Sequence, residues 1–122
     1  MQHEELYLTD IVSAADAMAR FIAGMTEGVF VASDIVRSAV MYKLIVIGEA
    51  AASLPDSFRV RHPQVPWVDV AAFRNKAVHH CFGTDWRTVW EVAVRDVPSL
   101  RALVVDILAA EFPSSASSSG PG

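Results

Sequence analysis

Apolar residues recur every three or four positions along most of this chain, which is the spacing of one face of an α-helix. The first run extends from about Glu5 to Gly24, and the glycine predicts where that helix ends. Thr26 suits the N-cap of a short second helix that carries Val29 and Phe30. The apolar positions of the first run are Leu8, Ile11, Val12, Ala15, Met18, Ala19 and Ile22.

The third predicted helix covers roughly Ile35–Leu54, follows a cap at Ser33 or Asp34, and is apolar nearly all round. Such a helix is expected at the centre of the fold. Gly48 inside it costs about 1 kcal/mol relative to alanine, which close approach of another helix would justify. Glu49 beside it is either an ordinary solvated charge or a buried partner for a basic residue.

Prolines divide the second half of the chain. Pro55 ends the central helix, and the proline-bounded segment after it allows a turn or two of helix around Phe58. A further helix is predicted over Trp67–Gly83, where the glycine suits a C-cap. The sequence contains no strand signals and no visible repeat.

The last helical stretch begins at Thr84 and Asp85, which suit a helix start. A kink or restart is expected at 96–98, because proline fits the first turn of a helix. Residues 1–112 are therefore predicted to form one domain, an all-α up-and-down helical bundle. The Ser, Gly and Pro residues of 113–122 bury nothing and are expected to be disordered.

The composition is unusually apolar for a soluble chain. Of the 122 residues 52% are hydrophobic, and the mean hydropathy is +0.32. No apolar run approaches the ~18–20 residues of a membrane span, because Arg37, Lys43 and Glu49 break the richest segment. An interface between copies of the chain explains the surplus better, so we expect a homodimer. Acidic residues near the N-terminus and the lone Cys81 predict no export and a cytoplasmic protein.

The charge is unevenly distributed. A formal net charge of −4 argues against a general nucleic-acid binder. Between Arg59 and Arg87, however, five basic residues face two acidic ones, a local balance of +3. This cluster is either a positive field centred on the Trp67–Gly83 segment or an ordinary solvated face.

The predicted Trp67–Gly83 helix also concentrates polar side chains: Arg74, Asn75, Lys76, His79 and His80. A metal site is not expected there. Neighbouring residues on a helix point about 100° apart, so His79, His80 and Cys81 cannot close around one ion, and the distant His62 adds no paired motif. Cys81 falls on the apolar face of the predicted Trp67–Gly83 helix, where a free cysteine is usually an unreactive small hydrophobic residue.

The remaining chemistry for these polar side chains is acid–base catalysis on a phosphate. The imidazole of His79 can take and return protons near neutral pH, and the Arg74 guanidinium presents a fork of donors to phosphate oxygens. This pair suffices for RNA cleavage without a metal, since RNA supplies its own nucleophile, the 2′-OH. Asn75, one turn before His79, could orient the ring or bind a phosphate oxygen. The plainer alternative is a salt bridge and a surface histidine.

The spacing of the pair sets a geometric condition. Residues five apart on a helix point roughly 140° from one another. Arg74 and His79 therefore meet at one substrate only if the arginine curls round the helix or a second copy of the helix faces the first.

Phe73 to Phe82, FRNKAVHHCF, resembles the R-N-x-x-x-H-x-Y signature of the HepT-like ribonuclease toxins of the HEPN superfamily. The likeness extends over roughly residues 6–108. It implies a helical bundle that dimerises with its motif helices face to face, with Arg74, Asn75 and His79 at the catalytic positions. Lys76 and His80 flank them and are expected to contact substrate. It also implies an MNT-type nucleotidyltransferase antitoxin as partner, which adenylylates the motif tyrosine to silence the toxin.

Cys81 stands where the motif has tyrosine, so this chain departs from the family pattern at the regulatory position. The leading interpretation is a metal-independent endoribonuclease toxin with no cofactor. The rival interpretation is a non-catalytic HEPN module that binds nucleotide or RNA or scaffolds its partner. A helical dimer without remaining activity is the third.

Overall fold

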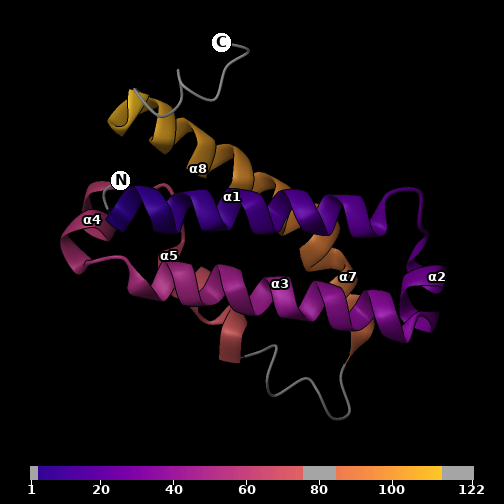
Figure 1. The fold of residues 1–122 in the computed structure, drawn as a ribbon. Coiled ribbons are helices and arrows are strands. Elements are labelled where there is room, and N and C mark those ends of the chain that lie inside the picture. Colours follow the sequence, from indigo (N-terminus) through magenta and orange to yellow (C-terminus); the bar gives the residue numbers. More distant parts are fainter. Residues whose placement is uncertain (1–2, 76–84, 114–122) are drawn as a thin grey trace.

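The computed structural model describes residues 3–75 and 85–113, and within these ranges the chain is helical and without strands. Helices α1 and α3 run side by side in opposite directions, and α8 crosses behind α1 (Figure 1). The prediction of an all-α bundle is therefore confirmed. The elements are α1 (His3–Ile22), α2 (Glu27–Ala32), α3 (Asp34–Ser53), α4 (Asp56–Arg61), α5 (Trp67–Ala71), α7 (Trp86–Glu91), the π-helical turn η1 (Val92–Asp96) and α8 (Val97–Glu111).

The core lies where α1, α3 and α8 meet. Its fully buried side chains include Leu8, Ile11 and Met18 of α1, Val40 and Ile47 of α3, and Val104 and Ile107 of α8. Helix α3 packs on α1, α2 and α5, in agreement with the predicted central position.

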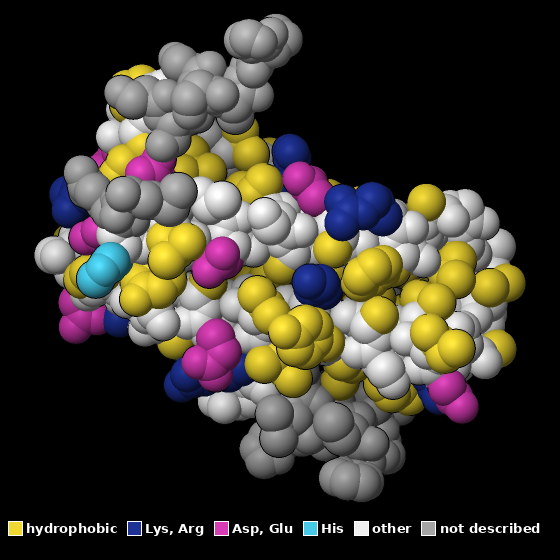
Figure 2. All heavy atoms as spheres, viewed as in Figure 1, with side chains coloured by type: hydrophobic (Ala, Val, Ile, Leu, Met, Phe, Trp, Pro, Cys, Tyr) yellow, Lys and Arg dark blue, Asp and Glu magenta, His cyan; other side chains and the backbone are white. Residues whose placement is uncertain are grey.

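Helix α3 is nevertheless not covered all round. Ile35 is 83% exposed and Tyr42 61% exposed. Hydrophobic side chains gather on the face formed by α1 and α3, mostly towards α2 (Figure 2). In a single copy of the chain, part of the apolar circumference of α3 therefore faces solvent.

The predicted helix starts are capped by the expected side chains. Thr26 Oγ1 accepts from the Val29 backbone N–H at 3.2 Å, and Ser33 Oγ accepts from the Val36 N–H at 3.2 Å. At α7, Asp85 accepts from the Arg87 N–H at 3.1 Å. The Thr88 hydroxyl donates to the same carboxylate, and this bond is the main reason that the pKa of Asp85 lies below its usual value. Thr84 lies outside the described residues.

The predicted Trp67–Gly83 helix is wrong in its described part. Helix α5 ends at Ala71, and a turn at Ala72 separates it from the helical residues 73–75. The Ala72 N–H is shared between the carbonyls of Val68 and Val70. The apolar spacing continues across this turn because both sides face α3 and the core. Periodicity therefore failed to reveal the interruption.

The predicted kink near Pro98 is a π-helical turn followed by a new α-helix. The Val97 N–H bonds to the carbonyl of Val92, five residues back, at the end of η1. Pro98 then occupies the first turn of α8, where its missing N–H is not needed. The predicted disordered segment 113–122 lies outside the described residues except for Pro113.

Among the described helices, none combines the length and the apolar character needed to cross a membrane.

Candidate functional site

The site begins at the contact between α3 and the turn that carries Arg74. A Cβ atom placed on Gly48 would lie 2.6 Å from the Arg74 backbone nitrogen and 3.2 Å from the Ala71 carbonyl oxygen. Real Cβ atoms do not approach backbone this closely, so only glycine fits. The predicted close approach at Gly48 is confirmed, and the approaching segment is the one that carries the motif arginine.

Arg74 extends along the outside of this contact towards Glu49. Its Nη1 donates to both carboxylate oxygens of Glu49 at 3.4 Å, a long and loose pairing. The Arg74 side chain is 40% exposed and that of Glu49 59% exposed. Glu49 therefore pairs with a basic residue, but it is solvated and is not the buried partner that one of the two alternatives expected. The guanidinium keeps exposed donors with which it could bind an anion.

The remaining predicted site residues divide between described and undescribed parts of the chain. Asn75 directly follows Arg74 and is exposed. Lys76, His79, His80 and Cys81 lie outside the described residues. The structure therefore places the arginine and the asparagine together, and it leaves the geometry of Arg74 relative to His79 as a prediction.

The positive charge of segment 59–87 is smaller in the folded protein, because several of its arginines pair with acidic residues outside the segment. Arg59 pairs with Asp56, Arg61 with Glu111 at 2.9 Å, and Arg74 with Glu49. All three acidic partners lie outside segment 59–87, so the local balance of +3 is largely offset in space. In the described part of the site, these pairings leave no broad cationic surface.

His62, considered with the other histidines as a ligand type, has a different role. Its side chain is 12% exposed, its ring hydrogen-bonds to Glu111, and the ring packs on Phe58 with centroids 4.7 Å apart. Its carbonyl accepts from the Trp67 indole N–H at 2.9 Å. His62 therefore joins α4 to the end of α8 and the start of α5.

Glu111 completes this junction. Desolvation raises the pKa of its carboxyl, but hydrogen bonds from Arg61 and His62 outweigh that effect and hold the pKa below its usual value.

The described residues contain no group of three or more His, Cys, Asp or Glu side chains arranged to hold a metal ion.

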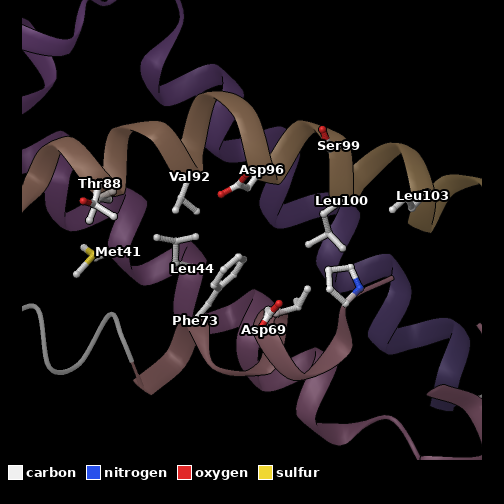
Figure 3. A pocket seen from close by; sticks show the side chains of 13 residues that line it. Met41, Leu44, Asp69, Phe73, Thr88, Val92, Asp96, Ser99, Leu100 and Leu103 are labelled. Atoms are coloured by element: carbon white, nitrogen blue, oxygen red, sulfur yellow. The ribbon is translucent and has the colours of Figure 1, made fainter. Parts of the chain in front are cut away.

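A cavity of about 600 Å³ lies on the other side of the Arg74 turn, between α3, α5 and the α7–η1–α8 stretch. Phe73, next to Arg74 in the chain, lines it together with Leu44, Val92 and Leu100 (Figure 3). Asp69 and Asp96 also line it and are both exposed, so their carboxylates lie at its rim (Figure 3). Sequence reasoning missed these two aspartates, because no spacing in the chain links α5 to η1.

Comparison with known proteins matches residues 11–107 to the family described as "Ribonuclease HepT-like". The chain belongs to the HepT-like ribonuclease family. "Putative RNase TTE0752" from Caldanaerobacter subterraneus subsp. tengcongensis is 33% identical over 105 residues, covering 86% of this chain and 94% of that protein. "Probable ribonuclease HepT" from Thermococcus cleftensis is 35% identical over 95 residues, covering 78% of this chain and 86% of that protein. No solved structure gives a significant match.

The resemblance inferred from FRNKAVHHCF is therefore confirmed at the level of the family. Family membership and relatives named as RNases support a ribonuclease function for this HepT-like chain. The motif arginine stands on a turn that is built into the fold through Gly48.

Proposed function

We propose that this protein is a metal-independent endoribonuclease toxin of a toxin–antitoxin pair and that it acts as a homodimer. The observation that carries the proposal is the placement of Arg74. Its backbone is fixed against α3 at Gly48, while its side chain is 40% exposed and only loosely held by Glu49. An arginine fixed at its base and free at its tip is suited to bind a phosphate.

In the proposed reaction the substrate 2′-oxygen attacks the adjacent phosphorus while the bond from phosphorus to the 5′-oxygen breaks. His79 takes the proton of the 2′-hydroxyl, and a histidinium returns a proton to the leaving 5′-oxygen. Arg74 stabilises the extra negative charge of the transition state, and Asn75 orients the imidazole or binds a phosphate oxygen. The products are a 2′,3′-cyclic phosphate and a 5′-hydroxyl.

A dimer would supply two copies of the motif to one cleft. Ile35, Tyr42 and Glu49 follow one another at intervals of seven residues along α3, so they share a face of that helix. The first two are exposed apolar side chains, and the third contacts Arg74. Burying this α3 face against a second copy would cover the apolar surface and bring the two Arg74 side chains towards each other.

The test is incubation of purified protein with a single-stranded RNA of mixed sequence in the presence of excess EDTA. Cleavage to fragments with 2′,3′-cyclic phosphate ends is expected. Complete loss of cleavage on chelation, or fragments that carry 5′-phosphates, would contradict the proposed chemistry.

The second candidate is a non-catalytic module that binds RNA or nucleotide or scaffolds a partner. The replacement of the motif tyrosine by Cys81 favours it, since this chain then departs from its family at the position that a nucleotidyltransferase antitoxin of the MNT type would modify. Binding of intact RNA without any cleavage, by folded protein, would support this candidate.

A further inference from the structure

The described residues that line the cavity beside the Arg74 turn combine an apolar interior with two carboxylates and two hydroxyls. Asp69 and Asp96 are carboxylates, which accept and do not donate when ionised. Thr88 also lines the cavity, but its hydroxyl hydrogen is already committed to Asp85 at 3.0 Å. The Ser99 hydroxyl donates to the Arg95 carbonyl at 3.1 Å and points away from the cavity (Figure 3).

The described residues that line the cavity include no lysine and no arginine. Among these described residues a phosphate would therefore meet two carboxylates and no cation. An occupant that fits would instead present N–H donors to the exposed carboxylates of Asp69 and Asp96 and a flat or apolar body to Phe73, Leu44 and Val92.

We infer that this cavity binds a nucleobase of the RNA substrate, and that it selects a base whose Watson–Crick edge carries an amino group, guanine above all. This inference rests on the proposed ribonuclease function. Guanine presents two adjacent N–H donors that one carboxylate can accept together. Uracil presents one N–H between two carbonyl oxygens, which the carboxylates repel.

The position of the cavity supports a base as its occupant. Phe73 faces the cavity, and the next residue in the chain is Arg74, the proposed phosphate-binding group (Figure 3). A nucleotide whose phosphate lies at Arg74 can thus direct its base into the cavity around the edge of the same turn. Aromatic side chains are the usual surfaces on which unpaired RNA bases stack.

A second copy of the chain is a poorer candidate for the occupant. The cavity is lined by Met41 and Leu44, which lie on the buried side of α3. The exposed apolar residues Ile35 and Tyr42 lie on the opposite, solvent-facing side of that helix. The cavity is therefore not continuous with the apolar face that we assign to dimerisation.

Nucleoside binding tests this inference without requiring cleavage. Guanosine, inosine and uridine are titrated into the full-length protein, and binding is followed by NMR chemical shifts. Inosine differs from guanosine only in lacking the 2-amino group. We expect guanosine to bind about tenfold or more tightly than inosine, the effect of one hydrogen bond to a charged group, and uridine to bind weakest.

Asp69→Asn and Asp96→Asn place an amide, which can also donate, where each carboxylate stood. Both variants are expected to lose the preference for guanosine. Asp106→Asn is the matched control, because it removes the same charge from an exposed position of α8, and it should retain the preference. Equal binding of the three nucleosides by wild-type protein would overturn the inference, as would a preference that survives in both variants.

The outcomes separate this inference from the proposed function. Selective guanosine binding by a protein that cleaves no RNA would support the nucleobase site and contradict the proposed ribonuclease function. RNA cleavage without nucleoside selectivity would support the ribonuclease function and contradict the nucleobase site. If the two variants change the oligomeric state and leave nucleoside binding unaltered, the cavity belongs to an interface between copies and the inference fails.

Discussion

A Cβ atom on Gly48 would stand 3.0 Å from the Cβ of Arg74 and 2.6 Å from its backbone nitrogen. The obstacle is backbone, which cannot swing aside as a side-chain tip can. The turn that carries the proposed catalytic arginine is therefore held against α3 through a contact that tolerates no side chain. Glu49, the next residue of α3, then meets the arginine at its other end.

Gly48→Ala is expected to destabilise the fold by about 1–3 kcal/mol, because overpacking outweighs the better helix propensity of alanine. Gly28→Ala is the control. Gly28 is also helical, but a Cβ there meets nothing within 4 Å, so that variant should gain about 0.5–1 kcal/mol. Urea unfolding measures both values. A Gly48→Ala protein as stable as the Gly28→Ala protein would show that the contact is not tight.

The lowered pKa of Glu111 predicts that the free energy of unfolding depends on pH. Its pKa in the folded protein lies below the ordinary value of 4.5, because hydrogen bonds from Arg61 and His62 overcome desolvation. A depressed pKa means that the stabilisation is present above about pH 4.5 and is lost as pH falls through the folded pKa.

Glu111→Gln should therefore cost about 1 kcal/mol at about pH 7 and less at about pH 3.5, as measured by urea unfolding. The exposed Asp106→Asn serves as control. A cost for Glu111→Gln that is the same at both pH values would contradict the assigned ion pair.

The oligomeric state of the protein tests whether the exposed face of α3 forms a dimer interface. We expect a dimer at micromolar concentration, and Tyr42→Lys should shift it towards monomer, because it places a charge on the face shared with Ile35 and Glu49. Val60→Lys changes a residue of α4 that is 76% exposed and should leave the dimer intact. Sedimentation equilibrium measures the oligomeric state. A monomeric wild-type protein would rule out a cleft that contains two copies of the motif.

Much of the fold could be predicted from local signals. Thr26, Ser33 and Asp85 cap helices because a side-chain oxygen near the first free N–H groups is sufficient, and that requirement is visible in sequence. Gly48 was informative because glycine is costly within a helix and needs a packing reason. The break at Ala72 was hidden, since periodicity reports which side chains are buried and not how the backbone is bonded.

The site was less predictable because it depends on distant segments. Arg61 and Glu111 lie 50 residues apart in the chain, and Arg74 and Glu49 lie 25 apart, so a local charge count misses both pairings. The cavity requires Asp69 of α5 and Asp96 of η1 to converge, and only the packing of the helices brings them together. The motif residues, by contrast, are recognisable in the sequence from their chemistry and from the family resemblance.

The replacement of the motif tyrosine by Cys81 predicts how a nucleotidyltransferase partner would act. A phenol accepts an adenylyl group as a stable phosphodiester, whereas a thiol would form a far more labile phosphorothioester. We therefore expect such a partner to silence this protein by covering the cleft of the proposed dimer, without lasting modification at residue 81.

Intact-protein mass spectrometry after co-expression, and again after incubation with the partner and ATP, checks this expectation. An inactive complex of unmodified mass is predicted. Cys81→Tyr is the matched variant and should gain the mass of an adenylyl group. A stable adenylyl mass on wild-type protein that maps to Cys81 would overturn the prediction.

The rate of RNA cleavage by the Arg74→Ala and His79→Ala proteins tests whether these two residues carry out catalysis. Circular dichroism confirms that each variant is folded, and Arg95→Ala, which removes an exposed arginine paired with Glu91, is the control. We expect each motif substitution to lower the rate by about 10²–10⁴-fold, the usual loss for one acid–base or charge-stabilising group, while the Arg95→Ala protein cleaves normally. Cleavage at the wild-type rate by folded His79→Ala protein would rule out His79 as the acid–base group.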